Sequence, residues 1–216
     1  MEQPRSQFAL MAERRFAPYF WTQLFGSFNS NLLKNALIVL MTYHAARFAA
    51  EGSMFAGMQP GVLVNFAAGL FVLPFILFSA TAGQVADKYD KAALMRLIKA
   101  CEVAVMALAA WGFLTANLGL LFAALFLVGT ESAFFGPIKY SILPQTLRET
   151  ELVGGNALVE TGTFVAILSR TLAGGWLASL GDAGPRAAAS GAPGPAVARL
   201  RAARPIPPAP ASGPGL

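Results

Sequence analysis

Long apolar stretches alternate with short polar connections over most of the chain, and no stretch alternates residue by residue as a membrane barrel strand does. A helix that crosses a bilayer needs about 20 mostly apolar residues. Five stretches reach this length, near residues 16–46, 61–82, 92–114, 118–135 and 152–180. The pattern therefore predicts an all-α membrane protein with five transmembrane helices.

Composition supports a membrane-embedded chain. Hydrophobic residues make up 56% of the sequence and charged residues 12%, and the mean hydropathy is +0.56. Soluble domains carry about 25% charged residues, so this chain has too few charges to cover a water-facing surface. Its net charge of +5 arises mostly after Asp182, where four Arg and no acidic residue follow. No basic patch suggests nucleic-acid binding, and a single cysteine, Cys101, forms no disulfide framework.

The positions of Lys and Arg predict the orientation, because cytoplasmic loops carry an excess of them. They gather in the N-terminal arm 1–15 and in the connections around residues 88–99 and 139–148, whereas the other connections hold Arg47 alone. The apolar stretch behind the arm is far longer than the core of a cleavable signal, so the first helix is expected to remain as an anchor. We therefore expect a multi-pass membrane protein with a cytoplasmic N-terminus.

Residues 183–216 differ sharply from the helical segment 16–182. They contain 11 Ala, 8 Pro, 5 Gly and 4 Arg, and no acidic residue. The prolines exclude a spanning helix, and this composition buries too little apolar surface to offset the entropy of ordering, so a disordered tail is expected. The abrupt change is typical of GC-rich DNA read out of frame, an interpretation that we favour over a natural extramembrane tail.

The predicted first helix carries a stripe of polar residues at four-residue spacing, formed by Gln23, Ser27, Asn31 and Asn35, with Ser30 and Lys34 beside it. Polar groups inside a membrane face the bundle interior or a wet cavity. Amides, hydroxyls and one ammonium suit a polar head group that crosses the membrane. We favour this role over hydrogen bonding between helices, which Asn and Gln also provide. For Asn65, alone in the second helix, the structural role is favoured.

Ionisable residues also occur in the later helices. Lys99 and Glu102 are three residues apart on one helix and can pair with each other. Glu131 and Glu160 lie on the fourth and fifth helices, and either can answer Lys34 across the bundle. The spacing leaves this choice open.

The fifth predicted helix carries small residues at four-residue spacing, a pattern that lets helices approach closely. The series is Gly162, Ala166, Gly174 and Ala178, and Arg170 occupies the remaining position. A long cation in such a series is either a functional charge or a lesion.

Motifs for catalysis are absent from the sequence. The single histidine, His44, has no acidic residue four or five positions on. There is no Cys/His cluster for a metal, no nucleophile elbow and no phosphate-binding glycine loop followed by Lys. We therefore expect no enzyme, no catalytic residue, no metal and no cofactor.

The segment after the second predicted helix reads Gly83-Gln-Val-Ala-Asp87-Lys88-Tyr-Asp90-Lys91. It resembles the signature loop between helices 2 and 3 of the major facilitator superfamily, where a glycine is followed by an acid four residues on and then by basic residues. In this interpretation Gly83 permits close packing at the helix end, and Asp87 offers a charge and a cap to a neighbouring helix terminus. Lys88 and Lys91 hold the loop in the cytoplasm.

Three further stretches resemble the bacterial lysophospholipid transporters, one branch of that superfamily. They are residues 28–36, residues 132–145 with the sequence Gly136-Pro137-Ile-Lys139-Tyr140, and residues 155–163. The resemblance implies flipping of lysophospholipid across the inner membrane for re-acylation, with membrane lipids and an acyltransferase as partners. Together with the stripe, it suggests a set of substrate or coupling residues: Ser30, Asn31, Lys34, Asn35, Glu131 and Glu160.

The sequence departs from this branch at three positions. The family usually has Asp at Ser30, Gln near Glu131 and Gly at Arg170. The lost carboxylate could have coupled to an ion or paired with Lys34, and the glycine fits the small-residue series, so we interpret Arg170 as a lesion.

The branch has twelve helices in two six-helix halves, and this chain is expected to resemble the N-terminal half without its sixth helix. On this interpretation we expect the chain to be incomplete and to be inactive alone. The alternatives are a non-transporting fragment and a transporter of another amphiphile.

Overall fold

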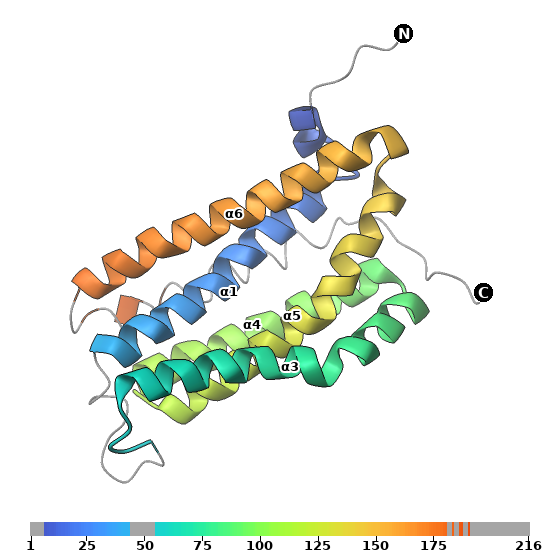
Figure 1. Ribbon diagram of the computed structural model, residues 1–216. Helices are drawn as coiled ribbons and strands as arrows, with labels where there is room; N and C mark the ends of the chain where they lie inside the picture. Colours follow the sequence, from blue (N-terminus) through green and yellow to red (C-terminus); the bar gives the residue numbers. More distant parts are fainter. Residues whose placement is uncertain (1–6, 44–54, 181–182, 184–185, 188–189, 191–216) are drawn as a thin grey trace.

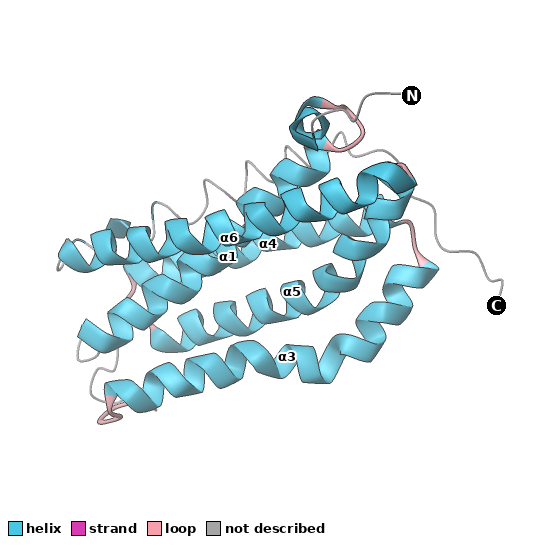
Figure 2. Cartoon of the chain, turned by 45° about the horizontal axis from the view of Figure 1, so that its top comes forward, coloured by secondary structure: helices cyan, strands magenta, loops and turns pink. Residues whose placement is uncertain are grey.

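The computed structural model describes residues 7–43 and 55–180 and four isolated positions beyond them, 183, 186, 187 and 190. A short 3-10 helix, η1 (Gln7–Ala12), precedes five long helices: α1 (Ala17–Tyr43), α3 (Pro60–Lys88), α4 (Lys91–Leu114), α5 (Leu118–Thr146) and α6 (Glu149–Ser179) (Figure 1). The described residues contain no strand (Figure 2). The predicted all-α fold with five long helices is confirmed.

The helix α5 is longer than the sequence predicted. It was expected to end near Phe135 but continues to Thr146, through Pro137 and Pro144. Proline removes a hydrogen-bond donor and usually ends a helix. Inside a membrane a break in the helix costs more free energy than a bend, because an irregular backbone there finds no water for its polar groups. The helix therefore bends and continues, and Figure 1 shows its C-terminal part turned away from the rest.

The helix α3 also continues past its predicted end. Residues 83–88 were expected to form a loop but belong to the helix, so only Tyr89 and Asp90 connect it to α4. Pro74 bends α3 near its middle. At this level α3 meets α5 closely, because a Cβ added to Gly129 would lie 2.5 Å from the Phe71 carbonyl oxygen and 3.1 Å from Pro74 Cγ.

In the part of the chain that the structure describes, four helices are long and apolar enough to cross a membrane, namely α3, α4, α5 and the part of α6 up to Ala173. The helix α1 has 27 residues, about 40 Å at 1.5 Å per residue, but its polar stripe makes it less apolar. A spanning helix tolerates such a stripe when the stripe faces other helices. The chain is a multi-pass membrane protein.

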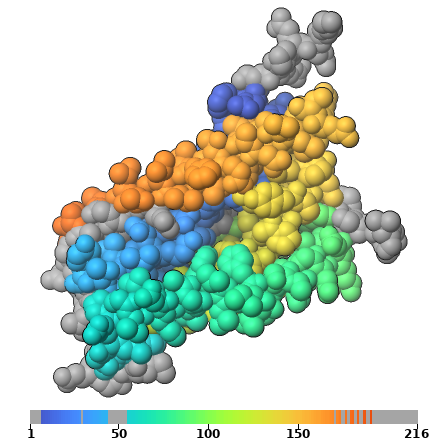
Figure 3. All heavy atoms as spheres, viewed as in Figure 1, coloured from blue at the N-terminus to red at the C-terminus, as the bar shows by residue number. Residues whose placement is uncertain are grey.

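The helices pack in two groups. The helix α1 lies along α6, while α3 and α4 both lie along α5. The space-filling view shows α1 beside α6 and α3 beside α5 on one face (Figure 3). One apolar cluster joins α1, α3, α4 and α5 at the end where α4 turns into α5. A second cluster lies at the opposite end and joins η1, the start of α1 and the α3–α4 and α5–α6 ends.

The small residues of α6 pack against α1. A Cβ added to Gly162 would lie 3.4 Å from Phe20 and 3.5 Å from Leu24, and Ala166 is buried. The side chains of Arg170, Gly174 and Ala178 lie outside those that the structure describes, as do His44 and almost all of the predicted tail 183–216.

Candidate functional site

The polar stripe of α1 starts between the two apolar clusters. In α1, the second cluster ends at Phe20 and the first begins at Leu33. Gln23 and Asn31 are buried, and Ser27, Ser30, Lys34 and Asn35 are half-buried. The Gln23 amide donates to Ser27 Oγ at 3.2 Å, and the Asn31 amide donates to the Ser27 carbonyl at 2.6 Å. The stripe therefore points into the bundle and satisfies part of its hydrogen bonding within α1.

The ammonium of Lys34 contacts the neighbouring helix α3. Its Nζ lies 4.2 Å from the centroid of the Phe71 ring, which is a favourable position for a cation over an aromatic face. The side chain thus faces a helix rather than lipid. Asn65, on the same neighbouring helix, is exposed.

A buried cluster of charges joins α4 to α5. Lys99 Nζ lies 2.8 Å from Glu131 Oε1 and 3.4 Å from Glu102 Oε2, and it lies 3.9 Å from the centroid of the Phe135 ring. The side chains of Lys99, Glu102 and Glu131 are 1%, 0% and 7% exposed. The expected pairing of Lys99 with Glu102 is present, and Glu131, considered as a partner for Lys34, binds Lys99.

A second group of charges joins α5 to α6 and is more open. Lys139 Nζ and Tyr140 Oη each lie 3.0 Å from the same atom, Glu160 Oε1. The side chain of Lys139 is 10% exposed, whereas that of Glu160 is 43% exposed. Tyr19 Oη donates to the Lys139 carbonyl at 2.8 Å, so α1 also reaches this point.

The Gly136-Pro137 part of the same motif lies inside α5. Because Pro137 has no N–H, it cannot close the usual helical hydrogen bond to the Ala133 carbonyl. A Cβ added to Gly136 would have no described atom within 4 Å apart from its chain neighbours and its own helix backbone. The motif thus shapes the helix just before Lys139 and Tyr140. The fold brings these two residues to Glu160, which was predicted to lie on another helix and was considered only as a partner for Lys34.

The signature segment lies where α3 passes into α4. The residue that caps α4 is Asp90, whose Oδ1 accepts from the Ala93 N–H at 2.7 Å, while Asp87 and Lys88 are exposed and Lys91 is buried. The expected close packing at Gly83 is not seen, because a Cβ added there would have no described atom within 4 Å apart from its chain neighbours and its own helix backbone. The reason is that α3 continues past Gly83, which lies within the helix and not at its end.

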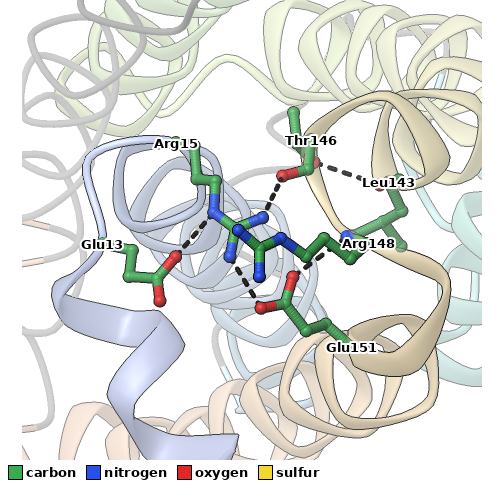
Figure 4. Close-up of polar contacts among 6 residues, drawn as sticks. All are labelled: Glu13, Arg15, Leu143, Thr146, Arg148 and Glu151. Carbon is green, nitrogen blue, oxygen red and sulfur yellow. Dashed lines mark hydrogen bonds and ion pairs between the residues drawn. The ribbon is translucent and has the colours of Figure 1, made fainter.

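A charged network at the edge of the bundle was not predicted from the sequence, where the cations of the arm 1–15 served only as markers of orientation. Arg15 binds Glu13 Oε2 at 2.6 Å and Glu151 Oε1 at 2.7 Å, and the other Glu151 oxygen accepts from the Arg148 backbone N–H at 3.0 Å (Figure 4). The hydrogen bonds from Glu151 and then Glu13 raise the pKa of the Arg15 guanidinium above its ordinary value. No local pattern reveals a pair 136 positions apart.

Among the residues that the structure describes, no group of three or more His, Cys, Asp or Glu side chains could hold a metal ion. The site therefore consists of amides, hydroxyls and ion pairs inside a helical bundle.

Comparison with known proteins finds relatives among the lysophospholipid transporters. No family model matches the chain. It is 33% identical over 158 residues to the lysophospholipid transporter LplT of Escherichia fergusonii. The aligned region covers 73% of this chain and 35% of that protein. It is 35% identical over 108 residues to LplT of Pectobacterium carotovorum, covering 50% and 25%, and 32% identical over 156 residues to LplT of Escherichia coli, covering 72% and 34%. The chain therefore spans about a third of the length of these relatives.

Proposed function

We propose that this chain, a relative of the lysophospholipid transporters of the major facilitator type, takes part in moving lysophospholipid across the bacterial inner membrane. The similarity to these transporters over 73% of the chain carries the proposal. The fold supports it, because apolar helices enclose amide, hydroxyl and charged groups. A lipid with a polar head and one acyl chain needs such groups along its path, since an unpaired polar group in hydrocarbon costs several kcal/mol.

Within the bundle, we assign contact with the substrate to Ser30, Asn31, Lys34 and Asn35 of α1, and we place Glu160 of α6 beside the path of the substrate. These side chains are buried or half-buried, and Glu160 is also partly accessible. Glu131 has a different role in this proposal. It is held by Lys99 in a sealed cluster, so it positions α5 against α4.

We propose that the N-terminal arm, the α3–α4 connection and the α5–α6 connection face the cytoplasm, in accordance with the cations in them and at the adjoining helix ends. The fold supports a common location, because the second apolar cluster contains Leu10 of the arm, Ala92 at the start of α4 and Leu147 of the α5–α6 connection. The network of Arg15 with Glu151 also links the arm to the α5–α6 end. Lysophospholipid delivered to this side would be available to an acyltransferase.

Transport is tested by reconstituting the purified chain in vesicles with fluorescent lysophosphatidylethanolamine in the outer leaflet. A membrane-impermeant reductant quenches only label that has not been flipped. Protection that develops faster than in protein-free vesicles supports transport by this chain.

Saturable binding without flipping assigns lipid recognition to this chain and the translocation step to an assembly with further helices, as alternating access requires two moving groups. If the folded chain neither binds nor flips the lipid, the proposal is wrong.

A further inference from the structure

Two hydrogen-bond donors on adjacent residues of α5 converge on one carboxylate oxygen. Lys139 Nζ and Tyr140 Oη each lie 3.0 Å from Glu160 Oε1. The backbone behind them is held by the hydrogen bond from Tyr19 Oη to the Lys139 carbonyl. An ammonium and a phenol are thus arranged around the position of a single anionic oxygen.

This arrangement lies inside two helices that are long and apolar enough to cross a membrane. Lys139 comes seven residues before the end of α5, and Glu160 eleven residues after the start of α6, so they lie about 10 Å and 16 Å from those helix ends. Glu160 is nevertheless 43% exposed and Tyr140 54% exposed. A carboxylate so exposed at this depth does not face hydrocarbon. The face opens onto a wet space or another protein surface.

We infer that Lys139 and Tyr140 bind an anionic oxygen of the lysophospholipid phosphate, and that Glu160 occupies this position until the phosphate replaces it. The inference rests on the proposed function. A phosphate oxygen accepts charge-assisted hydrogen bonds from an ammonium and a hydroxyl, as a carboxylate oxygen does.

Exchange between these two anions avoids a costly intermediate. A buried cation left without a partner is strongly destabilising, but Lys139 passes from one anion to another. Glu160 belongs to a different helix and is partly exposed, so its side chain can leave without a change in α5. Its departure also removes an ion pair between α5 and α6, which links binding to the freedom of α6.

The inference is tested by measuring binding of lysophosphatidylethanolamine to the 216-residue chain in nanodiscs. Lys139→Gln removes the cation and should lower the affinity about tenfold, a loss equal to about 1.4 kcal/mol. Tyr140→Phe removes one neutral donor and should lower it about threefold. Glu160→Gln weakens the internal competitor and should raise the affinity about fivefold. Glu149→Gln, an exposed change on the same helix, is the matched control and should have no effect.

The opposite signs distinguish ligand exchange from a purely structural ion pair. If Lys139 and Glu160 only tie two helices together, their substitutions will both lower the affinity or both leave it unchanged, and the inference is then wrong. Tyr140→Phe keeps the ion pair intact and covers the case in which Lys139→Gln does not fold.

Two further probes identify the source of the phosphate. Monoacylglycerol has the chain but no phosphate, and its binding should not respond to the three variants. Inorganic phosphate has no chain and should bind far more weakly than the lipid. Equal affinity for inorganic phosphate would overturn the assignment to a lipid head group.

Failure of the wild-type chain to bind lysophosphatidylethanolamine contradicts the proposed function as well, whereas binding that the variants leave unchanged contradicts this inference alone.

Discussion

Two ion-paired groups on α5 lie about two helical turns apart and differ in access. Lys99 is enclosed with Glu102 and Glu131 between α4 and α5, whereas Lys139 binds Glu160 at an open face between α5 and α6. An enclosed group stabilises one arrangement of helices, since losing a partner leaves a charge in the interior. An open group is partly solvated and can change partners at a smaller cost. Burial therefore separates a structural cluster from one suited to binding.

The largest effect is expected when the enclosed cluster loses its cation. Lys99→Leu leaves Glu102 and Glu131 buried without the ammonium between them, and breaking a buried ion pair costs about 3–5 kcal/mol. The free energy of unfolding in mixed micelles should fall by that amount. Lys88→Leu, at an exposed position, is the control. A loss below about 1 kcal/mol would mean that this cluster is not sealed.

A smaller effect is expected at Lys34, whose ammonium lies over the Phe71 ring inside the bundle. Lys34→Ala should lower the affinity for lysophosphatidylethanolamine about tenfold, or about 1.4 kcal/mol, and leave the yield of folded protein nearly unchanged. Asn65→Ala provides the comparison, because Asn65 is an exposed polar residue on α3. Equal losses of affinity and of folded protein would instead favour a structural role for Lys34, as in the enclosed cluster.

The number and order of the helices could be predicted because the length of each apolar stretch can be measured in a single sequence. It placed the end of α5 too early, because the prolines in 137–144 suggest a break in water. Inside a membrane the helix continues. The last turns of α3 were also predicted wrongly, because a segment that contains glycine and charged residues is typical of a loop.

The candidate site was predictable only in part. Four-residue spacing gives the face of a helix, so the stripe of α1 could be identified and is found facing inward. Spacing does not say which helices adjoin, and the pairing of Lys99 with Glu131 depends on contact between α4 and α5 across 32 positions. The same limit hid the network of Arg15.

The network at the membrane edge should contribute less than the enclosed cluster. Arg15 is 33% exposed and binds Glu13 and Glu151, so solvent screens its charge and Arg15→Gln should cost about 1 kcal/mol. Thermal unfolding at low and high salt measures this, and the cost should shrink as salt rises. Arg14→Gln, at the exposed neighbouring position, is the control. A cost near that of Lys99→Leu would place this network among the sealed groups.

The smallest effect on stability is expected at the open ion pair. Glu160→Gln keeps the size of the side chain and an oxygen that can accept from both Lys139 and Tyr140. Lys139 is therefore not left without a partner, and the lost charge is partly solvated. Its cost should therefore be about 0.5 kcal/mol or less. Glu131→Gln makes the same chemical change in the enclosed cluster, where solvent does not screen Lys99, and should cost several times more. The two variants, unfolded side by side in the same micelles, isolate the contribution of burial from that of chemistry. If they cost the same, exposure does not separate the two groups, and the proposed exchange of Glu160 for a phosphate loses its physical basis.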